Sequence, residues 1–214
     1  VPPHKQEISK WMVYLANELK RLDVDVRLGT AADVQMLKEE GFDAVVLATG
    51  ARPVFPPVEG LDGNTAVDAW KVISQEVPVL AGNVLVVGGG MVGCEVCELL
   101  MHQRRGPMKV TMIEMLPEIG AGMVVNNKVP AMKRLAALGI RMMPSTKLIS
   151  VTADSAVVEC AGQQMTLDHL TQIIYACGAK SENSLYEDVK AAFDEVYCIG
   201  DAHEPAQALE AVRS

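Results

Sequence analysis

The spacing of apolar residues along the chain switches several times between a helical period and a strand-like one. From about His4 to Lys20, apolar residues recur every three or four positions with lysines and glutamates between them, which predicts an amphipathic helix. Three prolines and two glycines then crowd into residues 51–64, which favours a linker. Between these segments the pattern predicts a short strand at 24–28, a helix at 33–40 and a strand buried on both faces at 43–48.

The pattern is clearest in the middle of the chain. It predicts, in order, a strand at 84–87, a glycine-rich turn at 88–90, a helix at 91–105 and a second strand at 109–114. A strand, a turn, a helix and a strand make one complete βαβ unit, in which the two strands run parallel.

The other predicted segments continue the alternation of helices and strands. They are a short helix at 68–75, a helix at 127–138, a strand at 140–143, three alternating runs at 147–152, 155–160 and 163–167, a buried strand at 172–177, a strand at 195–199, and a final helix from about Pro205. The three alternating runs predict an antiparallel meander. The remainder predicts an α/β protein with Rossmann-like parallel sheets.

Composition and charge narrow the function classes. The chain has 214 residues, of which 50% are hydrophobic and 21% charged, as in an ordinary globular protein. No apolar run reaches the roughly 18 residues of a membrane span, and the net charge of −8 argues against a nucleic-acid surface. Five scattered cysteines suggest reduced thiols rather than a disulfide framework. We therefore expect a cytoplasmic protein that binds neither membranes nor nucleic acids.

A glycine motif carries the strongest chemical signal. Gly88-x-Gly90-x-x-Gly93 lies between a predicted strand and a predicted helix, as in dinucleotide-binding folds. The first glycine permits a tight turn, the second lets the backbone approach a pyrophosphate, and the third lets the helix pack closely on the strand. The pyrophosphate would lie at the positive end of the helix.

An acidic residue at the end of the next strand indicates which nucleotide binds. Glu114 can accept hydrogen bonds from the ribose hydroxyls and repels a 2′-phosphate, and no lysine or arginine lies between Thr111 and Gly122. NADH is therefore favoured over NADPH. The expected NADH-binding residues are Gly88, Gly89, Gly90, Met91, Val92, Gly93, Glu114, Met115 and Gly178.

Two further strand ends carry small and polar residues. Thr49, Gly50 and Ala51 follow one buried strand, and Gly200 and Asp201 follow another. The aspartate could hydrogen-bond the ribityl or phosphate part of a flavin, beside a glycine that admits the cofactor. These five residues form the expected FAD-binding remnant.

Four segments together resemble a known family. They are Val45–Pro53, the fingerprint at 88–93 followed by Glu95, Ile199–Ala202 with Ala208–Ala211, and Pro2–Ile8. The chain is similar to pyridine-nucleotide-dependent flavin reductases. In particular, it resembles the C-terminal half of the NADH:flavin oxidoreductases related to 2,4-dienoyl-CoA reductase and trimethylamine dehydrogenase.

The resemblance implies a flavin domain that is split by an inserted NADH domain. Residues 1–64 and 182–214 would be parts of the FAD domain, and residues 65–181 the NADH domain. In the intact protein NADH would pass hydride to FAD, and electrons would continue through an iron–sulfur cluster to FMN, where an unsaturated or amine substrate is reacted. This chain would be the electron-entry module, with NADH and the rest of its own polypeptide as partners.

The chain also departs from the family pattern. The family's FAD domain begins with a glycine fingerprint of its own, and its FMN barrel and cysteine-ligated cluster come earlier still; none of these is present here. We therefore expect a fragment with a complete NADH domain and an incomplete FAD domain. Such a fragment is not expected to turn over alone, and an exposed sheet edge could make it a homo-oligomer.

Two other functions remain open at this point. Cys94 and Cys97 have the spacing of a redox dithiol near a helix N-terminus, as in an enzyme similar to thioredoxin reductase. Alternatively, the chain is a non-catalytic module to which NAD binds only as a ligand. The terminal substrate is not specified by these residues.

Overall fold

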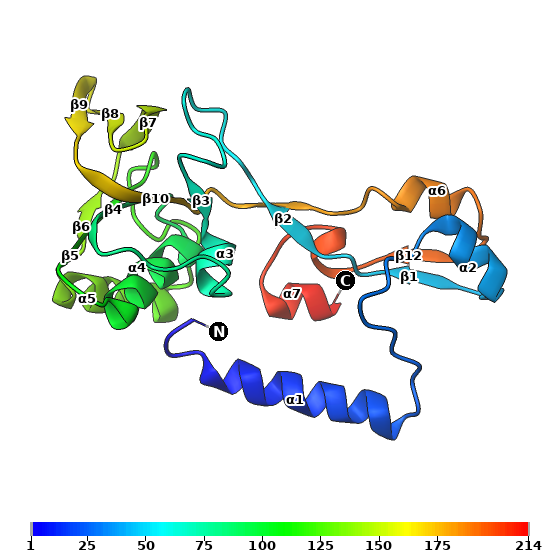
Figure 1. Cartoon of the computed structure of the whole chain (residues 1–214). Coiled ribbons are helices and arrows are strands. Elements are labelled where there is room, and N and C mark those ends of the chain that lie inside the picture. Colours follow the sequence, from blue (N-terminus) through cyan, green and yellow to red (C-terminus); the bar gives the residue numbers. More distant parts are fainter. Residues whose placement is uncertain (1, 214) are drawn as a thin grey trace. The chain divides into compact units, whose positions relative to one another are not determined.

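The computed structural model describes residues 2–213, and it divides the chain into two compact units. The first unit combines the residues up to Trp11 with Val54–Gly178, and the second combines Met12–Pro53 with the described residues from Ala179 onward. Both units contain helices and parallel strands (Figure 1), so the predicted α/β class is confirmed. The expected cofactor domains at 1–64, 65–181 and 182–214 divide the chain at other residues, and their assignment stays a prediction.

A parallel sheet forms the centre of the first unit. Its strands lie in the order β3-β10-β4-β5-β6, and every neighbouring pair is parallel. The bounds are β3 (Val67–Asp68), β4 (Gly82–Val87), β5 (Met108–Ile113), β6 (Arg141–Met143) and β10 (Leu170–Tyr175). The predicted βαβ unit is thus present as β4, α4 and β5, while β10 pairs with the opposite side of β4.

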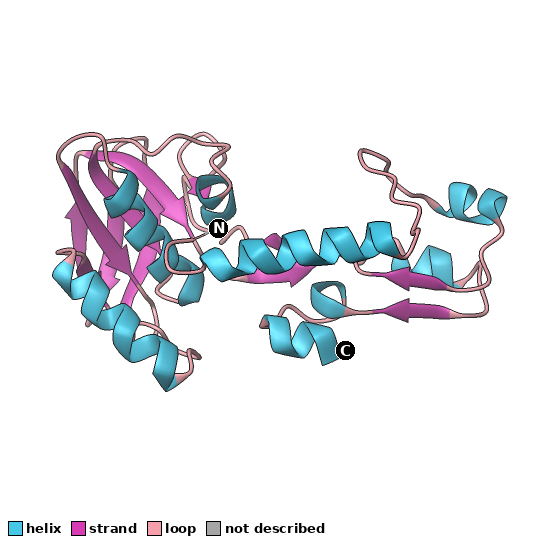
Figure 2. Cartoon of the chain, turned by 90° about the horizontal axis from the view of Figure 1, so that it is seen from below, coloured by secondary structure: helices cyan, strands magenta, loops and turns pink. Residues whose placement is uncertain are grey.

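Both faces of this sheet are covered. Helices α3 (Ala69–Ile73), α4 (Met91–Gln103) and α5 (Val125–Ala137) pack on the face that carries Val84 and Val86 (Figures 1 and 2). The other face carries Leu85 and packs on an antiparallel sheet of β7 (Thr146–Val151), β8 (Ala156–Cys160) and β9 (Gln163–Leu167), the predicted meander. Alternate residues of β4 therefore pack in two cores, which explains the unbroken apolar run from Val84 to Val87.

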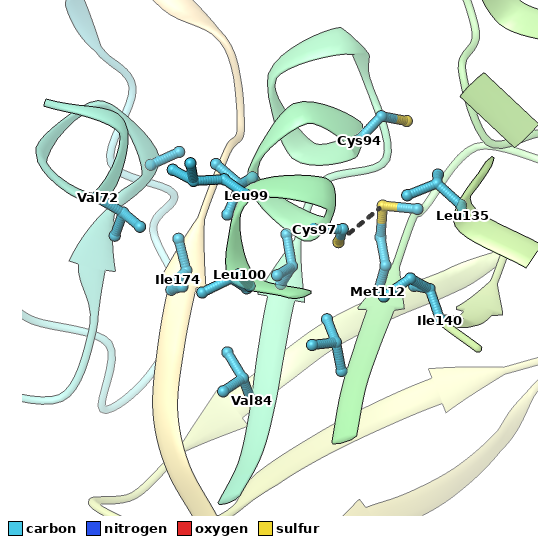
Figure 3. Packing of buried hydrophobic residues seen from close by; sticks show 14 of the residues in the cluster. Val72, Val84, Cys94, Cys97, Leu99, Leu100, Met112, Leu135, Ile140 and Ile174 are labelled. Carbon is cyan, nitrogen blue, oxygen red and sulfur yellow. Dashed lines mark hydrogen bonds between the residues drawn. The ribbon is translucent and has the colours of Figure 1, made fainter. Parts of the chain in front are cut away.

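The core on the helical face is closely packed. Figure 3 shows Leu99 and Leu100 of α4 beside Ile174 of β10, and Met112 of β5 beside Leu135 of α5. Leu100, Met112 and Leu135 are fully buried. Each such side chain contributes about 1.5–3 kcal/mol relative to an exposed one, so this packing fixes α4 against the sheet.

Ion pairs hold the N-terminal segment to α4 within the first unit. Lys5 pairs with Glu95, and Arg134 of α5 donates from Nε to Oε1 of Glu98 at 2.8 Å. His4 Nε2 lies 3.8 Å from the other carboxylate oxygen of Glu98, whose exposed fraction is only 3%. A buried carboxylate needs such partners, which explains why the first residues belong to this unit.

The second unit contains shorter elements. The parallel pair β1 (Val45–Leu47) and β12 (Val196–Cys198) forms one sheet, and the antiparallel pair β2 (Ala51–Pro53) and β11 (Ala179–Ser181) forms another. Its helices are α2 (Val34–Glu40), α6 (Tyr186–Lys190), the 3₁₀ turn η1 (Gly200–Ala202) and α7 (Ala208–Arg213). Helix α1 (Gln6–Arg21) begins in the first unit and continues into the second.

Local capping explains why α2 forms where it was predicted. The side chain of Asp33 accepts a hydrogen bond from Met36 N–H at 2.9 Å, and Gly41 ends the helix with φ of 70°. A side-chain acceptor at the start and a left-handed glycine at the end are the usual helix signals.

Two strand predictions need correction. Residues 24–28 form no strand, because no partner strand lies beside them; Arg27 instead binds Asp25 and Glu40, and Leu28 is 88% exposed. The strand β1 exists but is buried on one face only, since Val46 is 56% exposed. The predicted helix α1 is present, although none of its residues is buried.

Among residues 2–213, no helix combines the length and the apolar character needed to cross a bilayer.

Candidate functional site

A cleft opens where three parallel strands of the first unit end. Its volume is about 510 Å³. Gly88 follows β4, Glu114 follows β5 and Gly178 lies shortly after β10, and all three line the cleft. Because the chain leaves β4 towards β5 on one side while β10 lies on the other, this is the crevice in which open α/β sheets bind ligands.

The three fingerprint glycines have three different environments. A Cβ on Gly88, whose φ is 107°, would overlap the carbonyl oxygen of Ala176. A Cβ on Gly93 would overlap the carbonyl oxygen of Gly88, so α4 packs directly on the turn. A Cβ on Gly90 would meet no protein atom within 4 Å. The space over Gly90, on the cleft side of the turn, fits a close-lying pyrophosphate.

The N-terminus of α4 begins at this turn. Gly90 is the N-cap residue of the 13-residue helix, and no side chain caps it. The first N–H groups of a helix lack partners inside the helix and carry its positive dipole. The start of α4 therefore provides donors and favourable potential for an anion.

The carboxylate of Glu114 is held in place by backbone donors. Oε2 accepts from Gly89 N–H at 2.6 Å, and Oε1 accepts from Leu116 N–H at 2.9 Å. Each carboxylate oxygen has a second acceptor site, so Glu114 can still accept ribose hydroxyl groups. The same two bonds connect the glycine turn to the end of β5.

The predicted NADH-binding residues are divided between the cleft and its surroundings. Gly88, Gly90, Glu114, Met115 and Gly178 line the cleft, with Met115 68% exposed. The others lie in the turn or the first turn of α4 without lining the cleft: Gly89, Met91, Val92 and Gly93. Their part in binding NADH stays a prediction.

Sequence reasoning missed several cleft residues. Pro56, Pro57 and Val58 of the predicted linker line it, as do Thr146 and Lys147 of β7. The proline-rich composition indicated only a linker, and nothing local to residue 147 indicated a nucleotide. Glu114 and Lys147 are the two charged residues among the described residues that line the cleft.

The expected FAD-binding remnant gathers at one sheet edge in the second unit. Thr49, Gly50 and Ala51 follow β1, Gly200 and Asp201 follow β12, and the two strands are parallel neighbours. Thr49 Oγ1 donates to the carbonyl oxygen of Glu182, the carbonyl of Gly50 accepts from Glu182 N–H at 2.9 Å, and Asp201 accepts from Ala206 N–H at 3.2 Å. The role of these five residues in binding a flavin stays a prediction.

Comparison with known proteins places the chain in a family. The sequence pattern described as pyridine nucleotide-disulphide oxidoreductase matches residues 4–214. The chain belongs to this family. The resemblance to pyridine-nucleotide-dependent flavin reductases is thereby confirmed.

Relatives in this family include several reductases. The chain is 36% identical to a bilirubin reductase of Mediterraneibacter gnavus over 96% of its own length and 31% of that protein. It is 31% identical to an NADH oxidase of Thermoanaerobacter brockii, over 99% of its own length and 33% of that protein. It is 27% identical to a cinnamate reductase of Clostridium sporogenes, over 100% of its own length and 32% of that protein. The chain thus spans about a third of these relatives.

Two solved structures share its fold. A 2-naphthoyl-CoA reductase complex matches with a TM-score of 0.91 and 22% identity, over 99% of this chain and 32% of that one. Histamine dehydrogenase from Rhizobium sp. 4-9 matches with a TM-score of 0.84 and 17% identity, over 99% of this chain and 35% of that one. The predicted FAD/NAD(P)-binding fold is confirmed.

The structure argues against a dithiol in this member of the family. Cys94 and Cys97 are free and buried in α4; Cys97 contacts Met112 in the core (Figure 3). Burial, together with the nearby Glu98 and Glu95 carboxylates, raises the pKa of Cys94 to about 12, and burial raises the pKa of Cys97 well above its usual value. A reactive thiol needs a lowered pKa and access.

We expect both thiols to be unreactive in the folded chain and to make its stability depend on pH. Folding raises the pKa of Cys94 from the ordinary thiol value of 9.0 to about 12, so its contribution to stability is complete below pH 9 and is lost as the pH rises towards 12. Between pH 8 and pH 11, the free energy of unfolding measured in urea should fall less in a variant with Cys94→Ala and Cys97→Ala than in the unmodified chain. Rapid alkylation of Cys94 in the native chain at pH 7.5 would contradict this expectation.

Proposed function

We propose that this chain is the electron-entry part of a longer NADH-dependent flavin oxidoreductase. The observation that carries the proposal is the cleft at the ends of β4, β5 and β10, where an uncapped helix N-terminus, a glycine turn with open space over Gly90, and a carboxylate at Glu114 converge. Family membership and the reductase relatives support it.

Each part of the cleft has a distinct binding role. The N–H groups at the start of α4 bind the pyrophosphate, and Gly90 lets it approach. Glu114 accepts the ribose hydroxyls of the adenosine half and selects NADH over NADPH. Gly178, with φ of 96°, lies at the β10 side of the cleft and leaves room for the nicotinamide half.

The protein supplies position rather than acid–base groups. NADH provides a hydride and FAD accepts it, so no side chain of this chain has to carry a proton for that transfer. Thr49, Gly50, Ala51, Gly200 and Asp201 contribute the flavin-facing sheet edge of the second unit. Each unit contributes by binding its own cofactor in a fixed orientation.

The remainder of the electron path lies in parts of a longer polypeptide. We propose that electrons leave FAD through an iron–sulfur cluster to FMN, where an unsaturated or amine substrate is converted. The proposal draws on the relatives, of which this chain spans about a third and which include a bilirubin reductase and a cinnamate reductase. It also draws on the fold shared with histamine dehydrogenase.

Measurements on this chain and on the longer polypeptide test the proposal. The 214-residue chain should purify colourless and bind NADH in calorimetry, because its sequence contains one glycine fingerprint. It should self-associate in sedimentation, because each sheet of the second unit has two strands within the described part of the chain and so leaves edges unpaired there. The longer polypeptide should hold FAD, and NADH should bleach its flavin absorbance in single-turnover experiments.

The same measurements separate the alternatives. NADH binding without flavin reduction in the longer polypeptide would indicate a non-catalytic NAD-binding module. A yellow 214-residue chain with stoichiometric FAD would show that the flavin site is misplaced. Loss of flavin reduction on replacing both Cys94 and Cys97, with NADH binding intact, would support a dithiol enzyme.

A further inference from the structure

Lys147 lies beside Glu114 because two segments are joined by backbone hydrogen bonds. Thr146 N–H donates to the carbonyl of Glu114 at 2.7 Å, and Ser145 N–H donates to the carbonyl of Leu116 at 2.8 Å. The start of β7 is thereby fixed against the end of β5. Thr146 and Leu148 are buried, and Lys147 between them is exposed and lines the cleft.

The ammonium group of Lys147 has no ion-pair partner among the described residues. Its cross-strand neighbour on β8 is Glu159, yet no ion pair joins the two side chains in the described part of the chain. The carboxylate of Glu114 accepts hydrogen bonds from the N–H groups of Gly89 and Leu116 and forms no ion pair with Lys147. The Lys147 ammonium group is therefore an unpaired cation, within the described residues, that can bind an anion in the cleft.

We propose that Lys147 is a second specificity-determining residue of this cleft, which binds a phosphate on the 2′-oxygen of the adenosine ribose. The inference rests on the proposed nucleotide function and deepens it. Glu114 disfavours that phosphate and Lys147 favours it, so the chain discriminates less strongly against NADPH than its carboxylate alone would dictate. A lysine is suited to this because its ammonium is a compact charge on a flexible stem.

Calorimetry with four probes tests the assignment. NADPH and adenosine 2′,5′-bisphosphate carry the 2′-phosphate, whereas NADH and ADP do not. Lys147→Met should weaken binding of the first two about tenfold, equivalent to roughly 1.4 kcal/mol, and change binding of the other two less than about twofold. The effect should persist in a Glu114→Gln background, where NADPH binds more tightly. Lys147→Arg should retain the tighter binding of the 2′-phosphates.

Lys109→Met is the matched control. Lys109 is an exposed lysine on a strand of the same unit, near the start of β5 and away from this cleft. It should leave the affinities for all four probes unchanged. Thermal unfolding of each variant shows whether the fold is retained.

The outcomes separate the inference from the function on which it rests. Equal weakening of all four probes by Lys147→Met would place the ammonium on the 5′-phosphates and overturn the inference. No effect on any probe, with normal NADH binding, would also overturn it but leave the proposed function standing. Failure of the unmodified chain to bind any of the four would overturn both.

Discussion

Replacing Gly93 with alanine is expected to destabilise the first unit by about 3 kcal/mol, at the upper end of the usual range for overpacking. The added Cβ would overlap the carbonyl oxygen of Gly88, which is backbone and cannot move aside without shifting α4 or β4. Leu99 and Leu100 of α4 are packed in the core, so a displaced helix loses these contacts too. Urea unfolding followed by circular dichroism measures the loss.

Gly90→Ala is the matched variant. We expect it to weaken NADH binding strongly and to change folding stability little. Its φ of −72° suits alanine, and a Cβ there meets no protein atom within 4 Å. Folding stability should fall by less than about 1 kcal/mol, because the sole cost is that alanine is less favourable than glycine at the N-cap position. NADH affinity should fall at least about tenfold, because the methyl group enters the space for the pyrophosphate.

Gly63→Ala serves as the neutral control. Gly63 is exposed, has no positive φ, and would meet nothing within 4 Å. Both stability and NADH affinity should stay unchanged. If Gly90→Ala bound NADH as tightly as the unmodified chain, the pyrophosphate would not lie over this turn.

Glu114→Ala is expected to weaken NADH binding about tenfold to a hundredfold and to reduce the preference over NADPH. Hydrogen bonds to a charged acceptor contribute about 1.5–3 kcal/mol each before competition with water. The variant should also lose about 1 kcal/mol of folding stability, because the N–H groups of Gly89 and Leu116 lose their acceptor. Calorimetry with both nucleotides and urea unfolding measure the two effects separately.

Glu114→Gln distinguishes the charge from the hydrogen bonds. The amide keeps one acceptor oxygen but loses the negative charge, so it should recover part of the stability while still relaxing the discrimination. Equal affinities of the unmodified chain for NADH and NADPH would contradict the assigned role of Glu114.

The site could be located from sequence because its central elements are local. The strand β4, the glycine turn and α4 are consecutive, and Gly93 has no room for a Cβ because the carbonyl oxygen of Gly88, five residues earlier, lies against it. The position of Glu114 at the cleft was predictable for the same reason, since it directly follows the next strand of the same βαβ unit. Helix α2 was predictable from its own caps, Asp33 and Gly41.

Other features depended on partners far away in the sequence. Residues 24–28 alternate like a strand, but a strand needs a neighbour to satisfy its N–H and C=O groups, and none lies there. The spacing of α1 predicts a buried stripe, yet its apolar residues remain exposed within the described chain. Periodicity indicates which side chains share a face and says nothing of what covers it.

The sequence by itself determined the α/β class, the dinucleotide fingerprint and the acidic residue beside it, because each is encoded within one continuous βαβ segment. Only the tertiary structure decided that Lys147 and Pro56–Val58 line the same cleft as Glu114. Hydrogen bonds from residues 145 and 146 to the end of β5 bring that lysine into place. Such contacts join residues distant in the chain, and no local spacing encodes them.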